Sequence, residues 1–302
     1  MLGVIGDPMI DEWLDLTSTR RNPENDRTLV VHVNKPALRC PGGTLNLAVN
    51  LARTSGTLVH VVPTWGWCSR ELHQWLYATY NVFISSPFLG PESVTRKRRV
   101  SVDGVLMYRE DKDVLPDPDQ MEDRESMLQR LTYPWDALVV NDYDKGGVTP
   151  EIVAAALDAA ARARAWLVLD VKPRLLRRWL DAGYSLAGDV RTVVKMNEDE
   201  AALVLDAAPT ASALRARCDA TFAVITRGER GAVCSDVDTE NVFTAASRCV
   251  TPRSVCGAGD VFTALLTTSL VRGASFTCAT SRAAIETTRL VESGAPYTLV
   301  CG

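Results

Sequence analysis

The chain has 302 residues, of which 46% are hydrophobic and 23% charged, a composition typical of a globular protein with one large domain or one domain plus a small appendage. Its formal net charge of −4 argues against general binding to nucleic acid or to an anionic membrane surface, and no apolar run is long enough to cross a bilayer. The eight cysteines contain no C-x-x-C pair and follow no recognisable secretory leader, so we expect reduced thiols in a cytoplasmic protein rather than disulfides or a zinc site.

Residues 2–5 form an apolar run that predicts a buried strand ending at Gly6-Asp7. Ligands of α/β proteins bind at the ends of such strands, and Asp7 and Asp11 follow this one. A carboxylate such as Asp11 can accept two hydrogen bonds from neighbouring hydroxyl groups of a ligand. Either acid is alternatively a turn residue that bonds its own backbone, and for Asp7 we favour that interpretation.

Two segments, about residues 12–36 and 94–112, predict a small β-strand lid inserted in the core. The first mixes polar residues with a short apolar run at 29–33, between prolines. The second resembles a hairpin whose strands meet at Asp103-Gly104, a dipeptide typical of two-residue turns. We therefore expect the lid to be a small sheet.

The second lid segment carries four consecutive cations, Arg96, Lys97, Arg98 and Arg99. Successive side chains of a strand point to opposite faces, so Lys97 and Arg99 share one face. Such a pair, if it faces the site, would hold a ligand phosphate. The alternative is a solvated lid edge whose charges oppose aggregation.

Pro41-Gly42-Gly43 leads into a predicted helix that contains Asn46 in its first turn. Gly42 and Gly43 would let a ligand approach the backbone, and the Asn46 amide would reach a ligand hydroxyl. The alternative is a plain loop-to-helix cap.

Strands and helices then alternate: 137–140 predicts a strand, 150–164 a helix and 166–170 a second strand. This βαβ unit implies a parallel sheet with a right-handed connection. Asp142 and Lys145 follow the first strand, where they either line the site or form an exposed ion pair.

The strand at 193–196 leads to four polar residues at the start of a helix, Asn197, Glu198, Asp199 and Glu200. Such groups can bind Mg²⁺, which keeps part of its water shell and takes one or two carboxylates. Acids at a helix N-terminus are equally expected from the helix dipole alone.

A further strand at 222–226 ends in a turn formed by Thr226, Arg227, Gly228 and Gly231. This turn is either a phosphate-contacting loop or a tight hairpin turn.

Near the C-terminal end, Gly257, Ala258 and Gly259 open into the apolar helix that ends near Leu270. Small residues and a helix N-terminus together present backbone N–H groups to an anion such as a phosphate. Asp260 would be repelled by that phosphate, unless it takes a proton from the hydroxyl that attacks it. The alternative role of Asp260 is to stabilise the helix dipole.

Seven motifs in order resemble those of the ribokinase-like (PfkB) carbohydrate kinases, and they cover nearly the whole chain: GDPMID at 6–11, PGGTLNLAVNLA at 41–52, NDYDKG at 141–146, DVK at 170–172, NEDE at 197–200, TRGERG at 226–231 and GAGD at 257–260. The most similar branch is the kinase domain of the bifunctional heptose 7-phosphate kinases, through GDxMxD, PGGxxN, DYxKG and TRxxxG. The resemblance implies an α/β fold, namely a three-layer αβα core with a mostly parallel sheet, and one kinase domain spanning 1–302.

The resemblance also implies direct transfer of the ATP γ-phosphoryl group to a sugar or sugar-phosphate hydroxyl, with Mg²⁺ as cofactor. Asp260 matches the family's base, and 257–259 match its anion-binding turn. The expected substrate-binding residues are Asp11, Gly42, Gly43, Asn46, Asp142, Lys145, Lys97 and Arg99. The expected nucleotide-binding residues are Lys172, Asn197, Thr226, Arg227, Gly228 and Gly231, with Asn197 and Glu200 organising Mg²⁺.

Two positions depart from the family's pattern. Ser254 stands where many members carry an Asp that helps to bind a monovalent cation, so activation by K⁺ is in doubt. Arg282 stands where heptose kinases carry an Asn near the adenine, so we assign no adenine-contacting residue. The chain also lacks the H-x-G-H of a nucleotidyltransferase, so we expect it to supply only a kinase activity.

Three alternatives follow from these observations. One is a nucleoside or vitamin kinase of the same fold, and another is a catalytically idle regulator that binds nucleotide or sugar. A dinucleotide-dependent dehydrogenase is disfavoured, because no G-x-G-x-x-G follows the first strand. An exposed lid sheet is compatible with a homodimer formed through it, although no residue in the sequence identifies that interface.

Overall fold

The computed structural model describes residues 1–33, 37–65, 69–85, 94–115, 124–236, 239–243 and 256–293. Across these residues the core is a nine-stranded sheet in the order β14-β13-β12-β11-β10-β9-β1-β5-β6. Its strands are β1 (Leu2–Gly6), β5 (Val59–Pro63), β6 (Val82–Ile84), β9 (Ala137–Asn141), β10 (Trp166–Asp170), β11 (Arg191–Asn197), β12 (Phe222–Thr226), β13 (Ala232–Ser235) and β14 (Glu240–Phe243). All pairings from β6 to β12 are parallel, and β13 and β14 add antiparallel strands at one edge. The expected mostly parallel sheet is confirmed.

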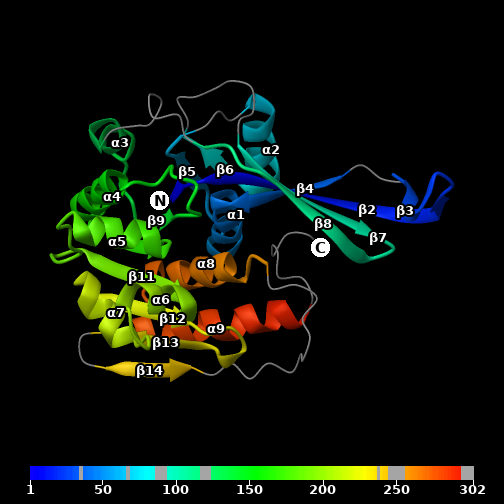
Figure 1. The fold of residues 1–302 in the computed structure, drawn as a ribbon. Coiled ribbons are helices and arrows are strands. Elements are labelled where there is room, and N and C mark those ends of the chain that lie inside the picture. The colour runs from blue at the N-terminus through cyan, green and yellow to red at the C-terminus, as the bar shows by residue number, and fades with distance from the viewer. Residues whose placement is uncertain are drawn as a thin grey trace.

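Helices cover both faces of this sheet, which gives the expected α/β architecture (Figure 1). One face packs against α1 (Thr44–Ser55), α2 (Arg70–Tyr80), α8 (Ala258–Val271) and α9 (Phe276–Glu292). The other packs against α3 (Arg124–Arg130), α4 (Pro150–Ala163), α5 (Pro173–Asp181), α6 (Glu198–Leu205) and α7 (Ala211–Cys218). In the described segments no helix has the length and apolarity required to cross a bilayer.

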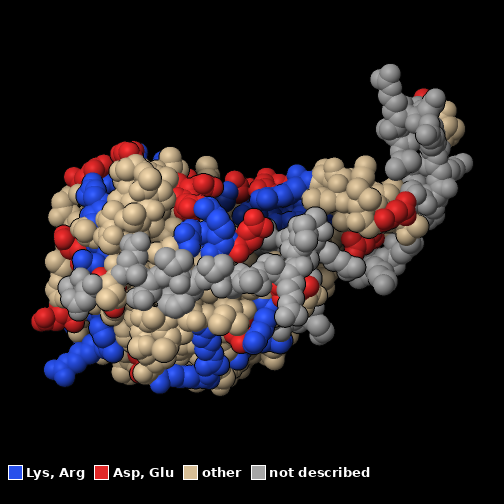
Figure 2. All heavy atoms as spheres, turned by 90° about the horizontal axis from the view of Figure 1, so that it is seen from below, with Lys and Arg blue, Asp and Glu red and all other residues tan. Residues whose placement is uncertain are grey.

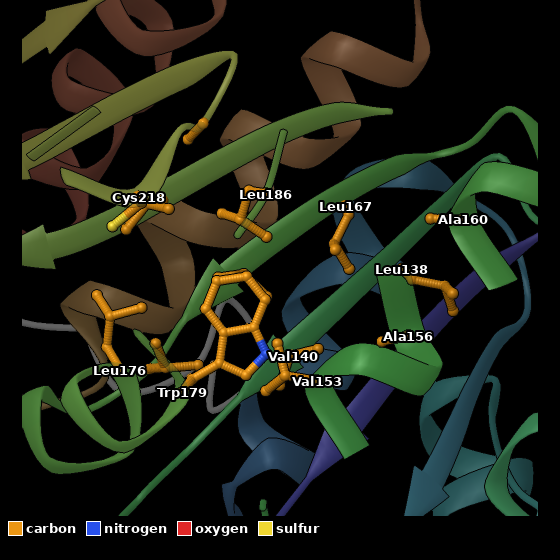
Figure 3. Packing of buried hydrophobic residues seen from close by; sticks show 14 of the residues in the cluster. Leu138, Val140, Val153, Ala156, Ala160, Leu167, Leu176, Trp179, Leu186 and Cys218 are labelled. Atoms are coloured by element: carbon orange, nitrogen blue, oxygen red, sulfur yellow. The ribbon is translucent and has the colours of Figure 1, made fainter. Parts of the chain in front are cut away.

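The central strands are mostly apolar because their alternate side chains enter two different cores. In β9, Ala137 and Val139 belong to the core under α1 and α8, whereas Leu138 and Val140 belong to the core under α4. Figure 3 shows the second core, where α4 presents the small side chains of Ala156 and Ala160 toward the sheet. Small residues let the helix approach closely, so the strand ends are held on a closely packed base.

A second sheet, which we call the lid sheet, projects from the core (Figure 1). It contains β2 (Pro8–Asn22), β3 (Asn25–His32), β4 (Leu38–Gly43), β7 (Thr95–Val102) and β8 (Val105–Lys112), in the order β3-β2-β7-β8 with β4 paired to β2. The hairpin between β7 and β8 is confirmed, and Asp103 and Gly104 both have positive φ angles, 50° and 80°. Figure 2 shows this projection, with acidic and basic side chains gathered where it joins the globular body.

The strand β2 is longer than the sequence predicts, since it continues through the polar residues after Asp11. It pairs with β4 and β7 near its start and with β3 farther along. Backbone pairing on both sides stabilises an extended chain without an apolar side-chain pattern, and such pairing is not visible in the sequence.

Candidate active site

The site lies where β1, β9, β10 and β11 end, beside the start of α8 and the base of the lid sheet. Gly257 caps α8 with a φ angle of 78°, a conformation that favours glycine. The first helical hydrogen bond runs from the Val261 N–H to the Gly257 carbonyl, so the preceding N–H groups are free of intrahelical partners. At Gly259 an added Cβ would lie 3.3 Å from the Lys195 ammonium, so a lysine lies against this turn. The turn can therefore receive an anion.

The Asp260 side chain lies in the first turn of α8 and is only 5% exposed. Its Oδ1 accepts a hydrogen bond from the Tyr143 hydroxyl at 2.7 Å, and its Oδ2 accepts one from the Asn46 amide at 2.6 Å. Burial raises the pKa of Asp260 to about 6, and these two hydrogen bonds oppose the rise. The carboxyl is therefore ionised at neutral pH and becomes protonated in mild acid.

The Asn46 side chain, on the first turn of α1, is oriented by a second asparagine. The Asn50 amide donates to both the Asn46 backbone carbonyl, at 2.8 Å, and the Asn46 side-chain oxygen, at 3.1 Å. That oxygen is thereby identified as the acceptor, which turns the Asn46 NH₂ group toward Asp260. Asn46 contacts the proposed base directly.

Asp11 lies on β2 and pairs with Arg99 of the neighbouring strand β7 at 2.8 Å. Both side chains are nearly buried, at 5% and 8% exposure. The Arg99 guanidinium also lies over the Trp13 ring, 4.7 Å from its centroid, and donates to the Cys256 sulfur at 3.5 Å. Arg99 is thus held by neighbours on three sides.

Gly42, on β4, faces this ion pair. An added Cβ would lie 2.3 Å from the Asp11 carboxylate, so the glycine makes room for that side chain. Gly43 has a φ angle of 54° and caps α1. The two glycines therefore shape the turn that holds Asp11 beside the start of α1.

The Lys97 side chain is half-buried and points to the same side of the lid sheet as Arg99. Its ammonium lies 5.4 Å from the centroid of the Tyr143 ring, and among the described residues it forms no ion pair. Burial lowers the pKa of Lys97, Asp11 opposes this, and the charges of Arg109 and Lys145 lower it further. Arg98, on the opposite face, pairs with Glu12 instead.

Asn197 and Glu200 form a capping box at the start of α6. The Asn197 side chain accepts from the Glu200 N–H at 2.8 Å, and the Glu200 carboxylate accepts from the Asn197 N–H at 3.0 Å. Glu200 also pairs with Lys172 at 2.6 Å. The described residues contain no cluster of three His, Cys, Asp or Glu side chains arranged to hold a metal. Any metal here would therefore need ligands from the nucleotide and from water as well.

The turn after β12 lies at the same edge of the sheet. Thr226 is the register partner of Asn197 across the parallel pair of β11 and β12. Gly228–Arg230 form one 3₁₀ turn, and the Arg227 N–H donates to the Gly231 carbonyl at 2.8 Å. The turn joins two antiparallel strands, so it is a tight hairpin turn that also adjoins the capping box.

Asp142 and Lys145 follow β9 but do not contact each other directly. Asp142 is 3% exposed and accepts hydrogen bonds from the N–H groups of Asp144 and Lys172. Lys145 pairs with Asp113 at 2.7 Å, beyond the end of β8. Asp142 therefore organises the backbone of two loops.

Asp7 differs from our favoured interpretation of a residue that bonds its own turn. It is 1% exposed and accepts from the Trp65 indole at 3.2 Å and from the Tyr143 N–H at 3.0 Å. The partners are 58 and 136 residues away, so a local turn motif could not reveal them. Ser254 lies outside the described residues, and Arg282 is exposed on α9.

Comparison with known proteins identifies the family. The model of the pfkB family carbohydrate kinases matches residues 117–285, more than half of the chain. The chain belongs to this family. It is therefore a kinase, and the family implies ATP as co-substrate, usually with Mg²⁺.

The chain is also similar to curated bacterial proteins. The bifunctional protein HldE of Koribacter versatilis is 26% identical over 283 residues, which cover 89% of this chain and 55% of that protein. The HldE of Gluconobacter oxydans is 27% identical over 293 residues, covering 89% and 56%. The chain thus spans about half the length of the curated relatives it matches.

Solved structures share the fold. Phosphofructokinase-2 from Escherichia coli superposes with a TM-score of 0.69 at 19% identity, covering 97% of this chain and 98% of that chain. A nucleoside kinase from Burkholderia thailandensis, in complex with inosine, has a TM-score of 0.60 at 15% identity, covering 99% and 93%. At these identities the likeness is evidence for the ribokinase-like fold alone.

Sequence reasoning assigned no role to four polar residues beside this candidate site: Asn50 and Lys195, and Tyr143 and Asp170, which lie within the NDYDKG and DVK motifs. Lys195 is 5% exposed and pairs with Asp170 at 2.9 Å, and Asp170 also accepts from Thr263 of α8 at 2.7 Å. Lys195 precedes Asn197 by two residues, so its place at a strand end was a usable signal. Tyr143 lay within the NDYDKG motif but was assigned no role.

Proposed function

We propose that this kinase transfers the γ-phosphoryl group of ATP to a hydroxyl group of a sugar or sugar phosphate, with Asp260 as general base. The observation that carries the proposal is the place of Asp260, a buried carboxylate in the first turn of α8 that directly follows the 257–259 turn, whose N–H groups have no intrahelical partners. A base and an anion-binding turn side by side are what transfer to a hydroxyl requires.

In the proposed reaction, the acceptor oxygen attacks the γ-phosphorus while the bond from that phosphorus to the ADP oxygen breaks. The hydroxyl proton passes to Asp260, and ADP leaves with the electrons of the broken bond. The N–H groups of the 257–259 turn stabilise the charge that develops on the phosphoryl oxygens. No covalent enzyme intermediate is needed.

The acceptor would be oriented by groups on both sides of the base. Asp11 offers carboxylate oxygens at the base of the lid sheet, and Gly42 and Gly43 would allow the acceptor to approach there because they have no side chains; Gly42 also makes room for the Asp11 carboxylate. Asn46 contacts the base itself at 2.6 Å, so a hydroxyl bound to it would lie within reach of Asp260.

The nucleotide would bind toward β11 and β12. Asn197 and Glu200 would hold Mg²⁺, which neutralises phosphate charge when bound and usually keeps part of its water shell. The Lys172 ammonium, which pairs with Glu200, would bind a nucleotide phosphate when the nucleotide is present. The turn containing Thr226, Arg227, Gly228 and Gly231 would contact the nucleotide phosphates, beside Asn197.

Lys97 favours an acceptor that is already phosphorylated. Its half-buried ammonium forms no ion pair in the described part of the chain: Arg109 and Lys145 repel it, and Asp11 and Asp111 attract it without forming an ion pair. A substrate phosphate would pair with it directly and offset the cost of its desolvation. Heptose 7-phosphate, converted to heptose 1,7-bisphosphate, is the acceptor that the motif resemblance implies.

The test is ADP release from Mg·ATP with heptose 7-phosphate, fructose 6-phosphate, ribose and adenosine as acceptors. We expect turnover with a sugar phosphate, and Asp260→Asn should lower kcat by a factor on the order of 10² to 10⁴. Asp181→Asn, an exposed change on α5, is the matched control and should keep wild-type activity.

Two results would contradict the proposal. One is full activity in a correctly folded Asp260→Asn variant, and the other is turnover with adenosine alone, which would indicate a nucleoside kinase. Binding of ATP without turnover on any acceptor would favour a regulator that has lost catalysis.

We also propose a cytoplasmic homodimer that forms through the lid sheet. The strand β8 is an edge strand, and its residues Val105 to Tyr108 are each more than half exposed. A second copy of this chain would cover that surface.

A further inference from the structure

Tyr143 connects the proposed base to the rest of the site. It follows the carboxyl end of β9, and its backbone N–H donates to the buried Asp7 carboxylate at 3.0 Å. Its hydroxyl donates to Asp260 Oδ1 at 2.7 Å. The residue is therefore fixed at its backbone by Asp7, which follows β1, and at its side-chain end by Asp260 of α8.

The Tyr143 ring lies near two lysine ammonium groups from different parts of the molecule. Lys97, on the lid strand β7, lies 5.4 Å from the ring centroid, and Lys172, after β10, lies 5.9 Å from it. Cations are attracted to an aromatic face at such distances. The ring thus connects the lid sheet to the side of the site where we place the nucleotide.

The Asp260 carboxylate keeps acceptor capacity despite its two partners. An ionised carboxylate has about four lone-pair positions, and Tyr143 and Asn46 use one on each oxygen. A substrate hydroxyl can therefore bind without displacing either donor.

Among the described residues, three further ionisable groups lie around Asp260. Asp170 of β10 and Lys195 of β11 act on its pKa in opposite directions, and Cys256 precedes α8. Burial and the neighbouring Asp260 charge hold the pKa of the Tyr143 phenol well above its usual value. Tyr143 is therefore a neutral hydrogen-bond donor at neutral pH.

We propose that Tyr143 is a positioning residue for phosphoryl transfer, which holds the Asp260 carboxylate charged and oriented toward the acceptor hydroxyl. This inference rests on the proposed function of Asp260. Tyr143 does not itself exchange a proton in the reaction. It acts on the base from one side, while Asn46, held by Asn50, acts from the other.

The decisive variant is Tyr143→Phe, which removes the hydroxyl and keeps the ring near both lysines. Removing a hydrogen bond to the charged form should move the acidic limb of the kcat/KM profile upward, by about one pH unit. At neutral pH kcat should fall about tenfold, while the KM for ATP changes less than about twofold. Tyr77→Phe, exposed on α2, is the matched control and should change neither quantity.

A second measurement does not depend on turnover. The Asp260 carboxyl carbon can be titrated by ¹³C NMR and assigned as the signal missing from Asp260→Asn. Its pKa should be higher in Tyr143→Phe than in wild type, and unchanged in Tyr77→Phe.

The outcomes separate the two proposals. An unchanged Asp260 titration in folded Tyr143→Phe would overturn the role of Tyr143, even in an active kinase. A loss confined to KM would overturn it as well. If wild type phosphorylates no acceptor, the proposed function fails, and the carboxyl titration still decides whether Tyr143 holds Asp260 in its charged form.

Discussion

Asp7 and Asp142 are two buried carboxylates at the ends of neighbouring strands, β1 and β9. Each accepts backbone hydrogen bonds from the loops that follow β9 or β10. Burial raises the pKa of Asp142 to about 7, and the charge of Asp7 contributes to the rise. These acids fix loop backbones, and one of those loops carries Tyr143.

The raised pKa of Asp142 makes the free energy of unfolding depend on pH. The folded state binds the proton more tightly than the unfolded state, so stability from this group is lost as pH rises from about 4 through about 7. Asp142→Asn removes this titration. The Tm of wild type should therefore fall relative to that of the variant between pH 5 and pH 8. The fall should be about 2 to 4 °C for each kcal/mol by which the free energy of unfolding decreases.

Differential scanning calorimetry at the two pH values checks this prediction. Asp189→Asn, an exposed substitution, should follow wild type at both. An Asp142→Asn variant whose Tm difference from wild type is the same at pH 5 and pH 8 would show that Asp142 does not titrate in this range.

At the scale of elements, the pairing of β2 with β4 places Gly42 against Asp11. In Gly42→Ala the added methyl group would meet the Asp11 carboxylate at 2.3 Å and displace it from Arg99. Loss of a charge-assisted hydrogen bond to the acceptor should raise its KM by about tenfold or more, because such bonds contribute about 1.5–3 kcal/mol.

Steady-state kinetics with each substrate varied in turn tests this expectation. The KM for ATP should stay near the wild-type value. Gly56→Ala is a suitable comparison, because its added Cβ meets nothing within 4 Å, although its φ angle of 74° adds a backbone strain that Gly42 does not have. Equal effects of the two variants would mean that the contact of residue 42 with Asp11 does not set the acceptor KM.

The start of α6 combines a structural and a proposed metal-binding role in Glu200. Glu200→Gln keeps an oxygen that can accept the Asn197 N–H, but removes the charge that pairs with Lys172. The concentration of Mg²⁺ needed for half-maximal activity should rise about tenfold or more, by analogy with other losses around metal sites. The free energy of unfolding should change by no more than about 0.5 kcal/mol, as for most surface substitutions, so the Tm should change little.

Glu198→Gln in the same helical turn is the matched control, because Glu198 pairs with Arg230 and has no proposed metal role. Both variants should unfold as wild type does. If Glu200→Gln has the same Mg²⁺ requirement as wild type, then Glu200 caps the helix and does not bind the metal.

At the scale of the whole molecule, the lid sheet leaves an apolar edge in solvent. Leu106 and Tyr108 on β8 are 56% and 55% exposed. Leu106→Glu should convert the proposed dimer to a monomer, because a charge buried in an apolar interface is strongly unfavourable.

Sedimentation velocity measures this effect. The protein concentration should be about 10 μM, at which a dimer with an interface of standard size is normally assembled. Leu203→Glu, at 58% exposure on α6, tests whether any surface glutamate has the same effect. A monomeric wild-type protein would rule out the lid interface, and so would dimers that persist in Leu106→Glu.

Much of the core was predictable because its strands and helices are encoded locally. Apolar runs bounded by glycine or polar residues identified β1, β9, β10, β11 and β12, and the Asp103-Gly104 turn located the β7–β8 hairpin. By contrast, β2 continues through polar residues that only pairing with other strands makes extended. The sequence therefore predicted which segments form the lid, but not the length of the strand β2.

For the site, the sequence alone determined that an acid follows a glycine turn at the start of an apolar helix, and that polar residues end several parallel strands. Only the tertiary structure decided the partners: Asn46 and Tyr143 reach Asp260 across 214 and 117 residues, and Arg99 is held by Asp11 across 88. Local periodicity specifies which face of an element a side chain occupies. Which groups meet, and hence the pKa of the proposed base, depends on how distant elements pack.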